Sequence, residues 1–533
     1  MMFLTYFTSI ILAIVALAVT KLLSFKDHGL FSQSNEEKLT KETITPLEFL
    51  KRRLRAWMYL ISGPQIIQAA YEKSNGNPFE VLAPDNRYVF VSSPHHISEL
   101  NNAPDTTLSL QAASKQMLQP KYTMTGFNWF DRRGTEGVGF IKALRTLLTN
   151  DMPSILPGLG SAISENFAKM HAKESIVHGA KGSPIYPMVV QLTVSTNSLA
   201  FFGKELASNT KFMKSALDFI EHTLMTAELV RLLPRVLSRP IGQLLASRLS
   251  SHQVIYEHLV VITEQRLLEQ SQANAGKSIP KHHDCIQYIL ETAPKKQPWS
   301  ARRIVHELMA IWFGSVHALS TTVTFTIHDL CLHPEYIAPL RSEVEGPAYN
   351  LFEQTARGLP LLDSFIKESA RLTPVESMST RRCALTPFTL SDGTHVGVGD
   401  WACTPVRAIM TNPQDYPNPL EFQGFRFVDL ASFKEDLSVT LLSEGTRPSN
   451  LTDCNNSWHV WGTGRMTCPG RFYAAAVMKV MLANIIKNYD CKLADEKAER
   501  WFTWRSNAKS QHLDFGIVND TLKSLVQGAS DIF

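Results

Sequence analysis

One cysteine near the C-terminal end stands between turn-forming glycines, directly before a helical segment. Residues 461–470 read Trp-Gly-Thr-Gly-Arg-Met-Thr-Cys-Pro-Gly, and residues 471–489 have the composition of a helix. A cysteine at a helix N-terminus lies near the positive end of the helix dipole and near backbone N–H groups, which favour its thiolate form. The loop therefore predicts either a thiolate ligand for haem iron or a structural cysteine buried in a turn.

A helical segment upstream carries a carboxylate and a guanidinium in helical register. The segment reads Phe-Ile-Lys-Glu-Ser-Ala-Arg over residues 365–371, and Pro374 follows it. Glu368 and Arg371 are separated by three positions, so their side chains lie on one helix face and can pair. If this pair is exposed it is an ordinary surface ion pair that contributes little to stability.

The cysteine loop resembles the haem-binding signature of the cytochrome P450 family, in which Phe, Gly, Cys and Gly recur at fixed spacing. Gly464, Cys468 and Gly470 match that spacing, and Trp461 stands where the family has Phe. The resemblance implies that Cys468 is the axial ligand of the iron of haem b. The run Cys-Pro-Gly-Arg-Phe-Tyr-Ala is similar to filamentous-fungal members of the family.

The upstream pair resembles the Glu-x-x-Arg motif of the same family, which is buried and joined by a second arginine. The segment 422–427 supplies that partner as Arg426. The resemblance implies that Glu368, Arg371 and Arg426 together support the cysteine loop. Arginine is the residue required in such a network, because its planar fork can bind a carboxylate through two hydrogen bonds.

The haem propionates that the resemblance implies need cationic partners. Met466 stands where the family usually has Arg or His, so the neighbouring Arg465 is the expected substitute. The other candidates are Arg381 and Arg382, with Lys142 and Arg145 as weaker ones. Each of these side chains could equally be a solvated surface charge.

Residues 301–332 predict one long apolar helix, which Ser300 begins and His333-Pro334 ends. Its middle aligns with the oxygen-binding segment of the P450 family, where an acidic residue followed by Thr relays protons. Here His317 takes the position of the acid and Ala318 the position of the Thr. Gly314 would let the haem or oxygen approach the helix backbone.

Three explanations of this departure remain open. His317 can relay protons itself, because imidazole titrates near neutral pH, with Ser320 or Thr321 supplying a hydroxyl from three or four positions along. The substrate can bring its own hydroxyl, or the reaction needs no second protonation. His317 could also be a histidine of the core without a chemical role.

Composition limits the remaining possibilities. The chain has 533 residues, is 44% hydrophobic and carries a net charge of +4, with 53 basic residues mixed among 49 acidic ones. We therefore expect a large buried core and no nucleic-acid partner. The seven cysteines include no Cys-x-x-Cys pair, which argues against a zinc site or a disulfide scaffold.

The N-terminus predicts a membrane anchor. Residues 1–20 carry no charged side chain, Lys21 and Lys26 follow, and residues 51–55 are strongly basic. The positive flank predicts a signal anchor with the rest of the chain in the cytosol, since a cleaved signal peptide would begin with a charged region. We expect an anchor at 1–23, a linker and basic helix at 24–60, and a catalytic domain at 61–533. The family resemblance implies the endoplasmic reticulum membrane.

The remaining pattern indicates a mainly α protein with small antiparallel sheets. Residues 79–82 and 88–91 predict one hairpin, residues 388–396 predict a second on an Asp-Gly turn, and residues 150–350 are almost wholly helical. A short helix is expected from Pro94 to Leu100, capped by serine. This order of elements is similar to the single-domain P450 fold.

The resemblance implies a membrane-bound fungal monooxygenase that uses O2 and electrons from NADPH through cytochrome P450 reductase. The substrate would be a hydrophobic intermediate such as a terpenoid, an indole-terpenoid or a polyketide-peptide, because candidate pocket residues such as Phe127, Trp129 and Phe130 are aromatic. The alternative enzyme keeps the fold but performs radical coupling, desaturation or rearrangement. A haem-thiolate sensor without turnover is the competing non-enzymatic hypothesis.

Overall fold

The computed structural model describes residues 46–127, 139–172, 176–177, 180–181, 185–294, 298–429 and 446–493. The predicted anchor at 1–23 and residues 24–45 of the predicted linker lie outside them. The helix expected around the basic run is present as part of α2 (Pro46–Ser74), which bends at Ser62, next to Pro64. A proline inside a helix removes one backbone hydrogen bond and produces such a bend.

Helices make up most of the described chain, which confirms the predicted fold class. The remaining helices are α3 (Pro94–Asn102), α4 (Leu110–Leu118), α5 (Pro120–Thr123), α6 (Gly139–Lys142), η1 (Ala143–Leu148), α7 (Thr149–Ala172), α8 (Ile185–Ala207), α9 (Thr210–Leu232), α10 (Arg235–Arg248), α11 (Ser251–Asn274), α12 (Cys285–Thr292), α13 (Ala301–Ser315), α14 (His317–Leu332), η2 (Pro334–Tyr336), α15 (Ile337–Glu345), α16 (Pro347–Thr355), α17 (Pro360–Leu372), α18 (Val406–Met410), η5 (Gly464–Met466) and α19 (Arg471–Asn488). The serine cap predicted for α3 is Ser93, whose side chain accepts a hydrogen bond from the backbone N–H of His96.

Strands form one five-stranded sheet and two small hairpins. They are β1 (Phe79–Leu82), β2 (Arg87–Phe90), β3 (Leu108–Ser109), β4 (Ile176–Val177), β5 (Ala180–Lys181), β6 (Met378–Ala384), β7 (Phe388–Thr389), β8 (His395–Val396) and β9 (Trp401–Pro405). Both predicted hairpins are confirmed, as β1 with β2 and β7 with β8. The large sheet has the order β1-β2-β9-β6-β3, and its β2–β9 pairing is parallel, which the strand patterns did not indicate.

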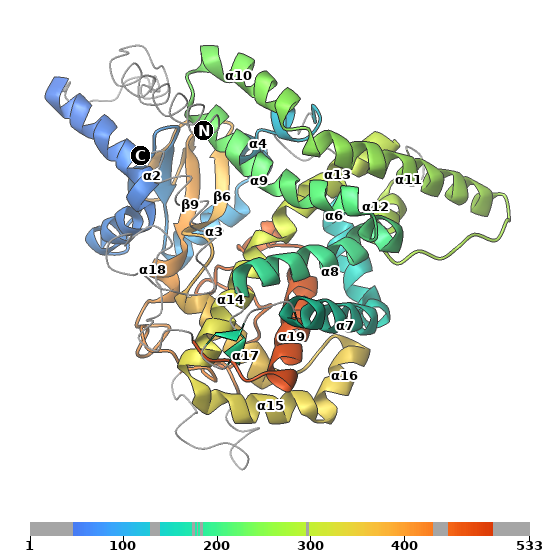
Figure 1. Cartoon of the computed structure of the whole chain (residues 1–533). Helices are drawn as coiled ribbons and strands as arrows, with labels where there is room; N and C mark the ends of the chain where they lie inside the picture. The colour runs from blue at the N-terminus through green and yellow to red at the C-terminus, as the bar shows by residue number, and fades with distance from the viewer. Residues whose placement is uncertain are drawn as a thin grey trace.

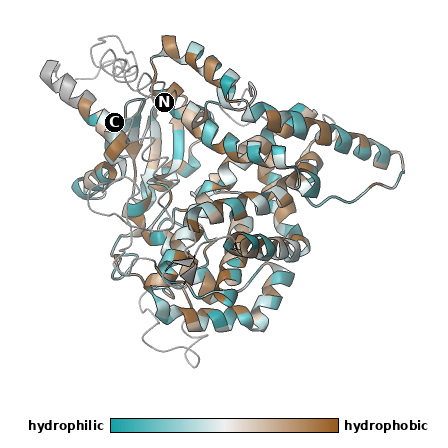
Figure 2. Cartoon of the chain, viewed as in Figure 1, coloured by the Kyte–Doolittle hydropathy of each residue, from teal (hydrophilic) through white to brown (hydrophobic). Residues whose placement is uncertain are grey.

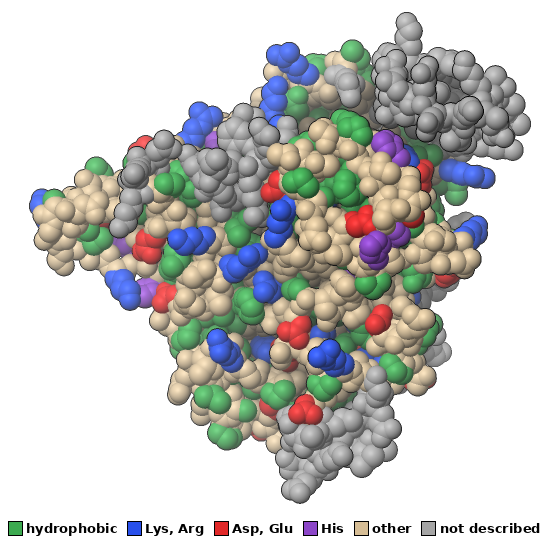
Figure 3. Space-filling view, turned by 180° about the vertical axis from the view of Figure 1, so that it is seen from behind, with side chains coloured by type: hydrophobic (Ala, Val, Ile, Leu, Met, Phe, Trp, Pro, Cys, Tyr) green, Lys and Arg blue, Asp and Glu red, His purple; other side chains and the backbone are tan. Residues whose placement is uncertain are grey.

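The sheet lies to one side of the molecule and the helices fill the rest, with α14 near the centre (Figure 1). α14 packs against α8, α17 and α19, and these helices contribute to the main hydrophobic core. Hydrophobic and hydrophilic residues are mixed along outer helices such as α11, where Val261 and Leu268 are exposed (Figure 2). On the face shown in Figure 3, basic and acidic side chains are interspersed with hydrophobic ones.

The prediction of a single long helix over residues 301–332 is wrong. The chain forms α13 and α14 instead, separated at Val316. Within the described residues this stretch is the one with the length and hydropathy of a membrane span, and 56% of its most apolar window is buried inside the protein. It is therefore a core element, and its interruption lies in the middle of the molecule.

Candidate functional site

The cysteine loop is a closed turn that contains η5 and leads into α19. The backbone N–H of Cys468 donates a hydrogen bond of 2.8 Å to the carbonyl oxygen of Trp461. Gly462 and Gly464 have φ angles of +73° and +64°. A Cβ atom on Gly464 would lie 2.7 Å from the side chain of Asn101. These two glycines are thus required by the backbone conformation and, at Gly464, by a close neighbour.

Gly470 has a different function from the other two glycines. Its φ is −91°, and an added Cβ would make only an ordinary contact with Leu144. Its backbone N–H instead forms a hydrogen bond to the sulfur of Cys468. Gly470 therefore contributes a donor to the sulfur rather than a special backbone angle.

The effect of burial on the pKa of Cys468 is larger than the effect of the groups that stabilise its thiolate. Burial raises the pKa of the Cys468 thiol, while the Gly470 N–H and the guanidinium groups of Arg471 and Arg145 lower it. The net pKa lies above its ordinary value. Burial thus opposes the thiolate that the helix N-terminus favours, and a cation at the sulfur would shift it toward the ionised form.

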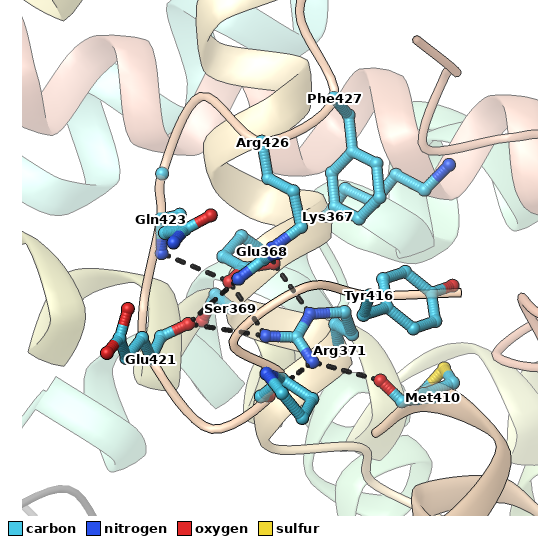
Figure 4. Close-up of polar contacts among 12 residues, drawn as sticks. Lys367, Glu368, Ser369, Arg371, Met410, Tyr416, Glu421, Gln423, Arg426 and Phe427 are labelled. Carbon is cyan, nitrogen blue, oxygen red and sulfur yellow. Dashed lines mark hydrogen bonds and ion pairs between the residues drawn. The ribbon is translucent and has the colours of Figure 1, made fainter. Parts of the chain in front are cut away.

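The predicted carboxylate–arginine pairing is present and fully buried (Figure 4). Arg371 donates through Nε to Glu368 Oε2 at 2.7 Å and through Nη2 to Oε1 at 2.8 Å. Arg426 donates through Nε to both oxygens of Glu368 at 3.1 Å. The exposed-pair interpretation is therefore excluded, because no side chain of this trio touches solvent.

The remaining donors of both arginines bind backbone carbonyls. Arg371 Nη1 donates to Met410 at 2.9 Å and to Pro419 at 2.7 Å, and Arg426 Nη1 donates to Pro417 at 2.6 Å. The trio thus connects α17 to the end of α18 and to the segment 417–428. Buried charges need this number of partners to offset their lost hydration.

A neighbouring lysine extends this connection to the cysteine loop. Lys367 donates to Ser449 Oγ and to the carbonyl of Asn450, both at 2.8 Å. The next carbonyl, of Leu451, accepts from the Trp461 indole at 2.6 Å. Sequence reasoning missed Lys367, and its position one residue before the paired carboxylate was the available signal.

The arginines that were predicted to bind the haem propionates lie in different parts of the structure. Arg381 and Arg382 lie on β6, where Arg381 pairs with Glu376 and Arg382 donates to the Arg381 carbonyl at 2.9 Å. Arg465 is 46% exposed and binds Asp105 at 3.1 Å.

One candidate that the sequence ranked low contacts the cysteine loop directly. Arg145 in η1 donates to the carbonyl of Thr467 at 3.3 Å, next to the cysteine. It is also one of the groups that lower the pKa of the Cys468 thiol. Arg145 is thus in contact with the cysteine loop, whereas Arg465 is held at the surface.

A side chain from another helix accompanies the break between α13 and α14. Asn197 in α8 donates through Nδ2 to the carbonyl of Ser315 at 2.9 Å and accepts from the Tyr473 hydroxyl at 2.9 Å. The Ser315 carbonyl thereby gains a partner where the regular helix ends. On either side of the break, Gly314 and Ala318 are exposed, although Val316 between them is buried.

His317 begins α14 and contacts a tyrosine that sequence reasoning missed. Its Nδ1 lies 3.3 Å from the hydroxyl of Tyr186, at the start of α8. Its Nε2 is buried and has no hydrogen-bond partner among the residues that the structure describes. Burial lowers the pKa of His317, so its neutral form predominates near neutral pH.

The two predicted hydroxyls lie in different places. Thr321 forms a hydrogen bond to the Tyr186 side chain and so lies with His317. Ser320 is fully buried and donates to Thr193 Oγ1 at 3.0 Å. Ser320 therefore binds a different part of α8 from the Tyr186 that His317 and Thr321 contact, because positions i+3 and i+4 of a helix lie on opposite sides of position i.

Among the predicted pocket residues, Phe127 stacks on His306 with ring centroids 4.5 Å apart. Trp129 and Phe130 lie outside the described residues. The aromatic contact is compatible with a lipophilic pocket wall, but it is equally a core contact.

The residues present fit a haem group. Cys468 offers a sulfur donor in a rigid turn, and Arg145 places a cation beside that turn. Gly314 leaves open space, because an added Cβ would meet nothing within 4 Å. A thiolate donor, cationic groups for propionates and a helix face without bulky side chains match the requirements of a bound porphyrin.

Comparison with known proteins identifies the family. The family model "Cytochrome P450" matches residues 68–507, so the chain belongs to the cytochrome P450 family. It is 28% identical over 446 residues to cytochrome P450 monooxygenase paxP of Penicillium paxilli, covering 82% of this chain and 81% of the relative. It is 27% identical over 472 residues to cytochrome P450 monooxygenase 151 of Postia placenta, covering 86% and 90%.

Solved structures agree in fold. The retinoic acid bound cyanobacterial CYP120A1 matches with a TM-score of 0.55 at 17% identity, covering 79% of this chain and 87% of that one. The cytochrome P450DA heme domain matches with a TM-score of 0.56 at 14% identity, covering 82% and 91%. The predicted family, fold and enzyme class are confirmed: the protein is a haem-dependent monooxygenase, an oxidoreductase related to fungal enzymes.

Proposed function

We propose that Cys468 binds the iron of haem b and that the enzyme oxidises a hydrophobic intermediate of fungal secondary metabolism. The oxidation would be a hydroxylation or a series of oxidations that use O2 and electrons from NADPH, delivered by cytochrome P450 reductase. The observation that carries this proposal is the closed turn at Cys468, whose backbone N–H is bound to the Trp461 carbonyl. Bound haem supplies oxygen activation, which a thiolate ligand favours by donating electron density.

The residues behind the turn keep the sulfur in place. Glu368, Arg371 and Arg426 form a buried unit bound to backbone carbonyls, so the segments that they join resist displacement. Arg145 would bind a propionate from beside the turn, with Arg381, Arg382 and Arg465 as the other cationic candidates. Gly464 allows the turn, and Gly470 supplies a backbone N–H to the sulfur.

His317 and Thr321 are proposed to handle protons. Oxygen activation needs protons delivered at a defined atom, and a neutral buried imidazole can donate from one nitrogen while accepting at the other. Gly314 and Ala318, one turn apart, would leave room for the bound molecule on the adjacent helix face.

Membrane attachment is part of the proposal, at the endoplasmic reticulum with the catalytic domain in the cytosol. Exposed hydrophobic side chains lie on α2, namely Leu54, Met58 and Ile61, and on α10, namely Val236 and Leu244. Both helices lie at the upper end of the molecule in Figure 1. Such side chains can insert into a lipid surface and would place the domain against it.

A second reaction class has one specific observation in its favour. Ala318 is exposed on the open face but carries no hydroxyl, so it cannot assist proton delivery. An enzyme that couples radicals, desaturates or rearranges its substrate without inserting oxygen would not need that hydroxyl.

Two measurements test these proposals. Reduced protein exposed to carbon monoxide should show the strongly red-displaced absorption band of a haem-thiolate, and correctly folded protein without this band would refute the proposed ligand. Turnover of an identified substrate under ¹⁸O2 should then place label in the product. Product without label would exclude oxygen insertion and favour the coupling reactions.

A further inference from the structure

Three side chains form a hydrogen-bonded group at the helix break. Tyr186 extends from the start of α8 to His317 Nδ1 at 3.3 Å, and Thr321, one helical turn beyond His317, hydrogen-bonds to the same tyrosine. Burial raises the pKa of Tyr186, whereas the Thr321 contact lowers it. Thr321 and Tyr186 each carry a hydroxyl that can donate and accept, so this contact orders both side chains beside His317.

One arrangement of hydrogens gives all three groups a partner. When Thr321 donates to the Tyr186 oxygen, the Tyr186 O–H is available for His317 Nδ1, which lies 3.3 Å away. A neutral imidazole that accepts at Nδ1 carries its hydrogen on Nε2.

The Nε2 atom of His317 is buried and lacks a partner within the described residues. A buried donor without an acceptor costs about 1–3 kcal/mol, and such groups occur where a ligand completes them. Gly314, three positions before His317, has no side chain, and Ala318, the next residue, has only a methyl group. Both are exposed, and an added Cβ on Gly314 would have open space around it.

We propose that Tyr186 is a positioning residue that holds His317 as the Nε2–H tautomer and aims this N–H at the molecule bound over Gly314 and Ala318. This inference rests on the proposed function, which places that molecule next to the haem. When Nε2 gives its proton to the bound acceptor, Nδ1 takes the Tyr186 proton and Tyr186 takes the Thr321 proton. Water then reprotonates Thr321, so one proton moves inward and no electron is transferred.

The test uses the carbon monoxide complex of the reduced full-length holoenzyme, which requires no substrate. An N–H donor close to bound carbon monoxide lowers its C–O stretching frequency in the infrared. We expect this frequency to rise in Tyr186→Phe and in His317→Ala relative to the unaltered protein. Thr321→Val should produce a smaller rise, because Tyr186 loses only its orienting donor.

Ser320→Ala is the matched control, because this hydroxyl lies on the same helix but binds Thr193. Its C–O frequency should equal that of the unaltered protein. An unchanged frequency in both Tyr186→Phe and Thr321→Val, with the red-displaced band intact, would overturn the inference. If Tyr186→Phe fails to bind haem, the C–O frequency of Thr321→Val alone decides whether the inference holds. Absence of the red-displaced band in the unaltered protein would instead refute the proposed function.

Discussion

The two sides of the candidate site differ in how fully their polar groups are partnered. On the cysteine-loop side, both oxygens of Glu368 accept from two buried arginines whose other donors bind carbonyls. On the helix-break side, His317 has one long hydrogen bond, and its buried Nε2 has no partner in the described part of the chain. Polar groups that all have hydrogen-bond partners hold the structure in one arrangement, whereas a polar group without a partner is available to a bound molecule.

This difference shows which side supports and which side reacts. Moving any member of a fully hydrogen-bonded network breaks hydrogen bonds and costs free energy. Such a network can therefore hold a metal ligand in one position. The helix-break side keeps a donor and open space within the core, at a cost in stability that the rest of the fold offsets. The following predictions test this division, from the largest expected effect to the smallest.

Cys468→Ala should abolish haem binding, because the substitution removes the sulfur donor. Purified protein should be colourless and lack the red-displaced carbon monoxide band. Cys454→Ala is the control, because Cys454 is exposed and its thiol donates to the carbonyl of Thr452. A red-displaced band in Cys468→Ala would assign the iron to another cysteine.

Glu368→Gln should destabilise the protein by about 3–5 kcal/mol, because two buried arginines lose their countercharge. The measurement is the denaturant midpoint, with haem release followed in parallel. Glu165→Gln serves as the control, because its ion pair with Lys169 is exposed on α7. The control should leave the midpoint unchanged, and an equally small change in Glu368→Gln would show that the buried unit is not a support.

Asn197→Leu should cost about 1–3 kcal/mol for each buried group that it leaves without a partner, here the Ser315 carbonyl and the Tyr473 hydroxyl. Hydrogen exchange should accelerate in peptides covering residues 313–320. Asn488→Ala removes only an exposed bond to the Asn484 carbonyl and should have little effect. Unaltered exchange in Asn197→Leu would mean that the break does not depend on this amide.

Ala318→Thr should change the partition of oxygen between product and hydrogen peroxide without altering haem content. The reason is that a new hydroxyl would lie beside His317 on the open face. Ala318→Val is the matched control, because valine has nearly the shape of threonine but cannot donate a hydrogen bond. Equal peroxide yields per NADPH in both variants would show that a hydroxyl at this position has no effect on proton delivery.

Prediction from sequence was most successful where spacing along the chain defines contact. Glu368 and Arg371 pair because three positions on a helix place them together, and the hairpins at residues 79–90 and 388–396 follow from local turn residues. It failed where the partner is distant in sequence. Asn197 and Tyr186 are 118 and 131 residues from the atoms that they bind, and nothing in the helical pattern at 301–332 indicates either.

The hydroxyls near His317 also show that spacing along the chain does not identify a partner, even within one helical turn. Ser320 and Thr321 are equivalent candidates by spacing, but only the packing of α8 against α14 separates them. The charge of the cysteine is a further example. A helix N-terminus favours a thiolate, but the extent of burial around Cys468 was not visible from its neighbours in sequence.

The sequence by itself determined the family, the mainly helical class, the cysteine turn and the Glu368–Arg371 pair, because each depends on residue type at short, fixed spacing. Only the tertiary structure decided where the central helix divides and which nitrogen of His317 has a partner. It also decided which arginine lies beside the cysteine. These features depend on side chains that arrive from other helices, and their hydrogen bonds and burial exist only after the helices have packed together.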